Sequence, residues 1–198
     1  TFSLIVTLLL LPFIFKLDIN LPNYIIILLI IKSILLLTSS LLFMKAIKHS
    51  EFSEVMPLKN LSPIFLLIIA YLALDENINA TKLLGVIIII GCVYLLERKS
   101  LNRSNIFRNK YFMYVGLSMI FVSFAAVLDK FIIRHANVYT SIFVPFLLMS
   151  VYLLAIQFIF YKGFYDIKDS LKNGKYWIFL SAITILLSDV LYFSTLVV

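Results

Sequence analysis

The chain has 198 residues and a formal net charge of +7, and 63% of its residues are hydrophobic while 14% are charged. Soluble domains carry about 25% charged and about 45–50% apolar residues, so this composition excludes an ordinary soluble fold. The mean hydropathy of +1.07 indicates that a lipid bilayer surrounds most of the chain.

Apolar blocks follow one another along the chain, each near the length of about 20 residues that crosses a bilayer as a helix. They cover approximately residues 1–15, 23–47, 53–74, 80–96, 111–134, 138–161 and 175–198. The blocks lack the two-residue alternation of a membrane barrel, and helices satisfy their own backbone hydrogen bonds in lipid. We therefore expect an all-α polytopic transmembrane helix bundle with about seven spans.

Block 23–47 contains Lys32, nine residues after its start. That is roughly 13 Å along a helix that rises 1.5 Å per residue. Ionisable residues at such depth face the bundle interior or a watery cavity. Two interpretations stay open: the lysine reaches the interface or pairs with another residue, or it lines a cavity and attracts an anionic substrate group.

Block 53–74 contains Pro57 and Pro63 on either side of Lys59 and Asn60. Proline removes a backbone donor and disturbs a helix. Carbonyl groups exposed in this way can line a transport site. The alternative is a simple kink beside a lysine that reaches the interface.

Basic residues concentrate in two connectors, 98–110 and 162–172. Both are short links between apolar blocks, so nucleic-acid binding is a poor explanation for their charge. The positive-inside rule explains it better and places both connectors in the cytoplasm.

Two acidic residues lie within the last blocks. Asp129 precedes Lys130 near the end of block 111–134, where we expect an interfacial ion pair. Asp189 lies near the middle of block 175–198, beside a polar stripe with helical spacing. The stripe consists of Ser181, Thr184, Ser188, Tyr192 and Thr195. It predicts either hydrogen bonds between helices or a substrate path in which Asp189 can carry a proton.

A faint internal repeat relates the two halves of the chain. Residues 39–47 read SSLLFMKAI and residues 188–196 read SDVLYFSTL. Upstream, LLLLPFIF at 8–15 is similar to LLAIQFIF at 153–160. In so apolar a sequence, chance is the alternative explanation for the match.

Residues 42–97 carry a more specific pattern of helix ends, prolines and glycines. Its features are, in order, Ala46, Pro57, Leu61-Ser62-Pro63, Glu76, Gly85, Gly91 and Tyr94-Leu95-Leu96. This order and spacing resembles the EamA-type domain of the drug/metabolite transporter superfamily, and the rest of the chain resembles it loosely. The two glycines also predict close helix packing, because small residues let helices approach one another.

The resemblance implies ten spans in two inverted repeats of five, of which this chain would hold spans two to eight. We expect a first repeat at 1–97, a basic connecting loop at 98–110 and an incomplete second repeat at 111–198. The first span and the last two would lie outside this sequence. The family arrangement places the loop outside the cell, against the positive-inside rule, so the membrane orientation stays open.

These observations predict a secondary transporter that moves a small metabolite, such as an amino acid, across the cell membrane by alternating access, with export as the expected direction. The candidate substrate-path residues are Lys32, Ser40, Lys59, Asn60, Pro63, Ser188, Asp189 and Tyr192. We expect no catalytic residue, metal site or cofactor, since the two histidines and Cys92 are scattered. The expected partners are a small-molecule substrate, the lipid bilayer and, as an option, a second copy of the chain.

Two alternatives come from other functional classes. The first is a non-transporting scaffold protein, against which the deep charges of Lys32 and Asp189 argue, because scaffolding does not require buried charge. The second is a membrane-embedded lipid enzyme, which would need clustered acid–base or nucleophilic groups.

Overall fold

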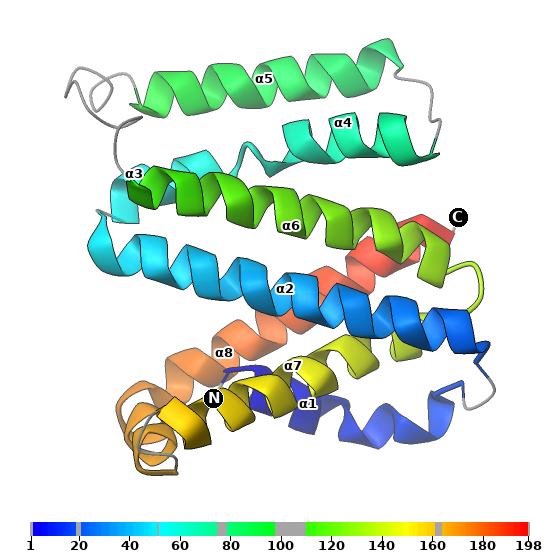
Figure 1. Ribbon diagram of the computed structural model, residues 1–198, viewed down its shortest axis with the longest axis vertical. Coiled ribbons are helices and arrows are strands. Elements are labelled where there is room, and N and C mark those ends of the chain that lie inside the picture. Colours follow the sequence, from blue (N-terminus) through cyan, green and yellow to red (C-terminus); the bar gives the residue numbers. More distant parts are fainter. Residues whose placement is uncertain are drawn as a thin grey trace. The chain divides into compact units, whose positions relative to one another are not determined.

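The computed structural model describes residues 2–18, 21–50, 52–74, 79–97, 110–160 and 164–197, and the elements in them are all helical (Figure 1). They are α1 (Phe2–Leu10), the 3-10 helix η1 (Leu11–Lys16), α2 (Asn23–His49), α3 (Phe52–Lys59), α4 (Ser62–Leu74), α5 (Ala80–Glu97), α6 (Lys110–Ile132), α7 (Val138–Phe160) and α8 (Phe164–Val197). The predicted all-α fold is confirmed. The expected connector 98–109 and Glu76 lie outside the described residues.

The described residues contain five segments that are long and apolar enough to cross a membrane. These are Asn23–His49, Val55–Ala73, Tyr111–Ile132, Val138–Ile159 and Tyr176–Leu196, and a shorter apolar helix covers Ala80–Leu95. The predicted block 1–15 is not among them, because an α-helix of nine residues there gives way to η1. Pro12 lies in the first turn of η1, and its missing N–H interrupts the α-helical ladder.

The predicted connector 162–172 differs from the structure. Helix α8 begins at Phe164, so most of this polar segment is helical. The segment contains no proline, and the helix can therefore extend beyond the apolar block into polar residues.

The helices form two compact units, which are described separately. Unit 1 contains Thr1–Leu37 and Leu128–Val198, and unit 2 contains Thr38–Val127. Each unit therefore takes residues from both predicted sequence repeats. The division of the chain into 1–97, 98–110 and 111–198 follows the repeat in the sequence and stays a prediction.

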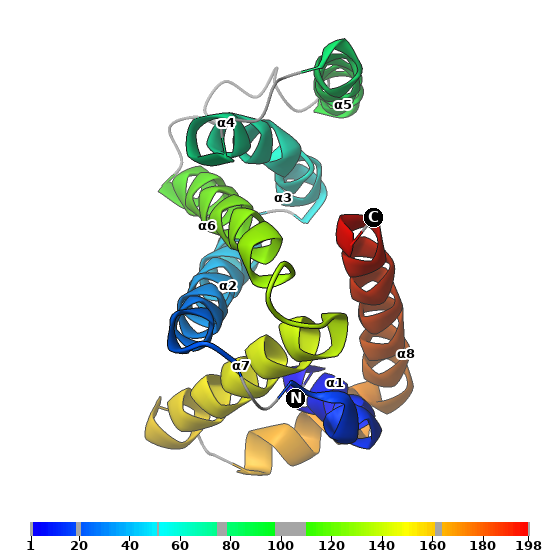
Figure 2. The same ribbon diagram turned by 90° about the vertical axis from the view of Figure 1, so that its right-hand side faces the viewer.

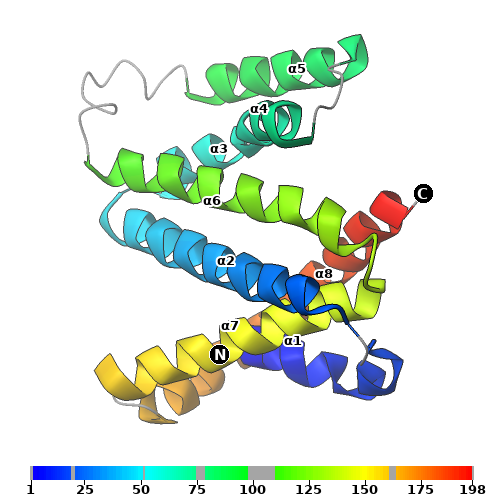
Figure 3. The ribbon, with the colours of Figure 1, turned by 45° about the vertical axis from the view of Figure 1, so that its right-hand side comes forward.

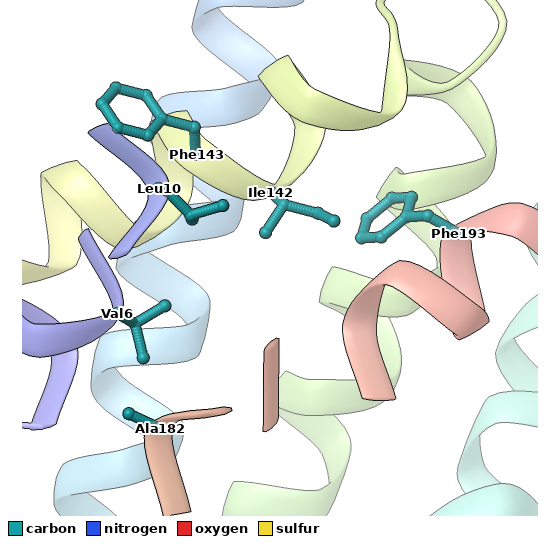
Figure 4. Close-up of a cluster of buried hydrophobic side chains, with 6 residues drawn as sticks. All are labelled: Val6, Leu10, Ile142, Phe143, Ala182 and Phe193. Atoms are coloured by element: carbon teal, nitrogen blue, oxygen red, sulfur yellow. The ribbon is translucent and has the colours of Figure 1, made fainter. Parts of the chain in front are cut away.

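Unit 1 packs α1 beside α7 and against α8 (Figures 1 and 3). Its buried apolar core consists of Val6, Leu10, Ile142, Phe143, Ala182 and Phe193. In Figure 4 the side chain of Ile142 points toward the ring of Phe193, so α7 and α8 meet through these two residues. A second cluster contains Ile25, Leu29, Ile132 and Ala136 and joins the start of α2 to the end of α6.

Hydrogen bonds tie the start of α7 to the segment that follows η1. The Asn137 side-chain oxygen accepts a bond of 2.8 Å from the Thr140 N–H, which is the geometry of an N-cap. The Asn137 N–H donates to Asp18 Oδ2 at 2.7 Å, and its side-chain amide donates to the Lys16 carbonyl at 2.6 Å. Asn137 therefore caps the start of α7 and also holds Lys16 and Asp18 against it.

Asn137→Ala is expected to destabilise the protein by about 1 kcal/mol, because the first turn of α7 loses its cap. The full-length protein in detergent would show a lower thermal unfolding midpoint. Asn137→Ser is the control, since serine also caps helices well and should restore most of the loss. Equal losses of stability in both variants would instead assign the effect to the hydrogen bond that the Asn137 side-chain amide donates to the Lys16 carbonyl.

Unit 2 contains α3, α4 and α5 with the parts of α2 and α6 that belong to it. In two views α4 lies between α5 and α6 (Figures 1 and 2). The Ser39 hydroxyl on α2 donates to the Ser118 carbonyl on α6 at 2.9 Å. The apolar core of this unit consists of Ala46, Val55, Val115 and Met119.

Candidate functional site

Lys32 lies on the buried face of α2 in unit 1. Its ammonium group is 2.5 Å from Asp129 Oδ1 at the end of α6, and its side chain is 5% exposed. It also donates to the Ser141 carbonyl on α7 at 3.1 Å and lies 4.8 Å from the centroid of the Phe193 ring on α8. Pairing with another residue is therefore the observed arrangement, and the paired side chain is buried.

Asp189 lies one helical turn before Phe193 on α8, on the same side of the helix. Its carboxylate interacts electrostatically with Lys32 and Asp129. No hydrogen bond or ion pair from the described residues reaches this carboxylate. Lys32, Asp129 and Asp189 thus form one group of ionisable side chains, which we call the charged cluster.

Tyr192 lies at the edge of the charged cluster. Its side chain is 37% exposed and interacts electrostatically with Asp129 and Asp189. Ser188 is exposed on the same helix. Three predicted path residues, Lys32, Asp189 and Tyr192, are thus brought together in unit 1.

The remaining members of the polar stripe bond to their own helix. The hydroxyl groups of Ser181, Thr184 and Thr195 donate to the carbonyls of Ile178, Leu180 and Tyr192 at 2.7–2.8 Å. Each donor is three or four residues after its acceptor, which is the usual way for a hydroxyl to bond within a helix. These three residues therefore make no hydrogen bond between helices in the described part of the chain.

The predicted path residues of unit 2 surround a break between α3 and α4. Pro63 has no N–H, so the Lys59 carbonyl loses its expected donor four residues later. The N–H groups of Asn60 and Leu61 instead bond to carbonyls three residues earlier, at 3.1 and 3.0 Å. The kink anticipated between the two prolines is therefore a complete interruption of the α-helix.

Lys59 and Asn60 are exposed at this break, and the Lys59 ammonium lies 4.2 Å from the centroid of the Phe43 ring. Ser40 is half-buried on α2. These residues belong to unit 2 and are described only within it, so their part in a substrate path stays a prediction.

Comparison with known proteins identifies the N-terminal part of the chain. Residues 2–98 match the model of the EamA-like transporter family. Residues 2–98 are an EamA-like transporter domain. The resemblance seen in the sequence is confirmed for these residues, which form a domain of multi-pass membrane transporters of the drug/metabolite type. No curated protein and no solved structure matches the chain.

Lys32 belongs to this EamA-like domain, whereas Asp129 and Asp189 follow it in the chain. Sequence reasoning missed Asp129, for which it predicted an interfacial ion pair. The Asp129 side chain is only 9% exposed, and its partner is Lys32. The available signal was that each residue is a costly charge in an apolar block and needs a partner of opposite sign.

The paired glycines of the EamA-like domain lie on an exposed face of α5. A Cβ atom added at Gly85 or Gly91 would meet no other described group within 4 Å. No described helix packs closely against these two glycines, and close helix packing there stays a prediction. The described residues also contain no cluster of three His, Cys, Asp or Glu residues that could hold a metal ion.

Proposed function

We propose that this EamA-like protein is a secondary transporter that exports a small metabolite, such as an amino acid or a related compound, across the cell membrane. The charged cluster carries this proposal. Lys32, Asp129 and Asp189 all lie in helices that are long and apolar enough to span a membrane. Charge within membrane-spanning segments is costly, and in membrane proteins it marks substrate and ion pathways.

Alternating access is the mechanism that fits this proposal. Transporters built from inverted repeats hold the substrate near the membrane midplane and rock one repeat against the other. The proposed repeats are 1–97 and 111–198, joined by the basic loop 98–110. The broken helix α3–α4 supports the proposal, because interrupted helices expose backbone groups that can contact a substrate.

The proposed substrate path keeps the residues that the sequence predicts. Its members are Lys32, Ser40, Lys59, Asn60, Pro63, Ser188, Asp189 and Tyr192. A homodimer, which the sequence left as an option, stays a prediction.

Transport by the full-length protein in liposomes tests the proposal. Vesicles loaded with one member of a panel of amino acids and related metabolites should take up the same labelled compound by counterflow. Protein-free vesicles give the background. We expect at least one compound to accumulate above it, and the absence of accumulation across the panel would contradict the proposal.

A further inference from the structure

The charges of the cluster do not balance. Lys32 supplies one positive charge, whereas Asp129 and Asp189 supply two carboxylates. The Lys32 ammonium is already engaged by Asp129 Oδ1, by the Ser141 carbonyl and by the Phe193 ring. Lys32 is thus neutralised by a fixed protein partner, and Asp189 is the carboxylate left without one among the described residues.

Helices α1 and α7 of unit 1 do not compensate this charge. Helices α1 and α7 contain no Asp, Glu, Lys, Arg or His residue. The ionisable groups that interact with Asp189 are therefore Lys32 from α2, Asp129 from α6 and Tyr192 from α8 itself. With Lys32 and Asp129 paired, the described cluster carries a net charge of about −1 at Asp189 when both carboxylates are ionised.

We propose that Asp189 binds a positively charged group and that the site prefers amines and zwitterions to simple anions. The positively charged group is either the ammonium of the substrate or a proton. Either one would neutralise the Asp189 carboxylate. This inference rests on the proposed transport function and names its substrate class. It replaces the expectation that Lys32 attracts an anionic group, because Asp129 already occupies that position.

The surroundings of Asp189 suit an organic ammonium group. Tyr192 is partly exposed beside it, and aromatic faces attract cations. Ser188 is exposed next to it in the sequence and offers a hydroxyl oxygen as a further acceptor. A carboxylate, an aromatic ring and a hydroxyl oxygen together recognise a positive charge. Within the charged cluster, as far as the structure describes it, the one cation is Lys32, which Asp129 already engages.

Ligand binding measured apart from transport tests the inference. The full-length protein in nanodiscs is heated with phenethylamine, phenylalanine or 3-phenylpropionate, and with butylamine, norvaline or pentanoate. These two series differ in size but repeat the same change from amine to zwitterion to acid. We expect the amine and the zwitterion of at least one series to raise the melting temperature by about 2–4 °C, and the acids to leave it unchanged.

Asp189→Asn should abolish the stabilisation by amines, whereas Ser194→Ala, at an exposed residue of α8 whose hydroxyl donates to the Leu191 carbonyl at 2.7 Å, should retain it. Occupation by a proton has a separate signature, which is a carbonyl band of a protonated carboxyl group in the infrared difference spectrum between acid and alkaline pH. This band should be lost in Asp189→Asn. Amine binding or the band supports the inference and identifies the occupant.

Three results of the binding and infrared experiments would overturn the inference: stabilisation by acids above amines, undiminished amine binding in Asp189→Asn, or neither amine binding nor the infrared band in the wild type. Because these readouts do not require transport, a failure of the transport proposal can be told apart from a failure of the inference. Transport of anions alone, with Asp189→Asn unaffected, would overturn only the inference.

Discussion

Lys32→Met is expected to destabilise the protein by about 3–5 kcal/mol, because it leaves the buried Asp129 carboxylate without its counter-ion. No hydrogen bond from the described residues serves Asp129 Oδ1, so the Lys32 ammonium is the group that compensates its burial. The substitution also removes a cation that attracts the Asp189 carboxylate. Two carboxylates would then remain close together in an apolar setting.

Asp129→Asn should cost less, about 1–3 kcal/mol. Lys32 would keep the Ser141 carbonyl and the Phe193 ring, and Asp189 would remain within electrostatic range. The two members of one ion pair are therefore expected to be unequal, because the cation has several compensating neighbours and the carboxylate has one.

The double variant Lys32→Met/Asp129→Asn measures the coupling free energy between the two charges apart from the effect of each single substitution. Removing both charges leaves neither member of the pair as an uncompensated ion, so its stability should return to within about 1 kcal/mol of the wild type. Equilibrium unfolding of the full-length protein in mixed micelles, followed by circular dichroism, gives all four free energies. Lys16→Met is a suitable control, since Lys16 is exposed and lies 5.2 Å from the centroid of the Tyr139 ring. Additive losses in the double variant would contradict a coupled pair.

Hydropathy was sufficient to predict the helices, since lipid admits few other backbone structures. It did not locate their ends. Pro12 shortens α1 to nine residues, whereas α8 extends through the polar residues after Phe164. Apolar length reports which residues can lie in lipid, but hydrogen bonding and caps decide where a helix begins and ends.

The candidate site was predicted only where local spacing carries the information. Asp189 and Tyr192 share a helix, so their periodicity brought them together in the prediction. The partnership of Lys32 with Asp129 joins residues far apart in the sequence and depends on how α2 and α6 pack. A single sequence indicates that each buried charge needs a partner, but it does not identify that partner.

The break between α3 and α4 was predicted in part from the sequence. Pro57 and Pro63 predicted a disturbed helix, because a missing N–H is a local property. That α3 ends at Lys59 and that Asn60 and Leu61 bond three residues back follows from the geometry of the chain around the prolines.

Asp189→Asn is expected to lower transport at low substrate concentration about 10- to 100-fold while leaving stability nearly unchanged. Hydrogen bonds to charged groups contribute about 1.5–3 kcal/mol, and every 1.4 kcal/mol corresponds to a factor of about ten. The substitution removes no ion pair or hydrogen bond from the described residues. It also spares the half-buried side chain the cost of a charge, so the unfolding free energy should be equal or slightly higher.

This combination distinguishes Asp189 from its neighbours in the charged cluster. Substitution of a charge that stabilises the fold should lower stability and transport together, as expected for Lys32→Met. Substitution of a carboxylate that binds an external cation should lower transport alone. Counterflow and unfolding measured on the same preparations separate these cases, with Ser194→Ala as the control on the same helix and Asp189→Glu expected to recover part of the activity. A large loss of stability in Asp189→Asn would assign Asp189 to the fold. Undiminished transport would remove it from the path, and the imbalance of charge around Lys32 would then need a different occupant.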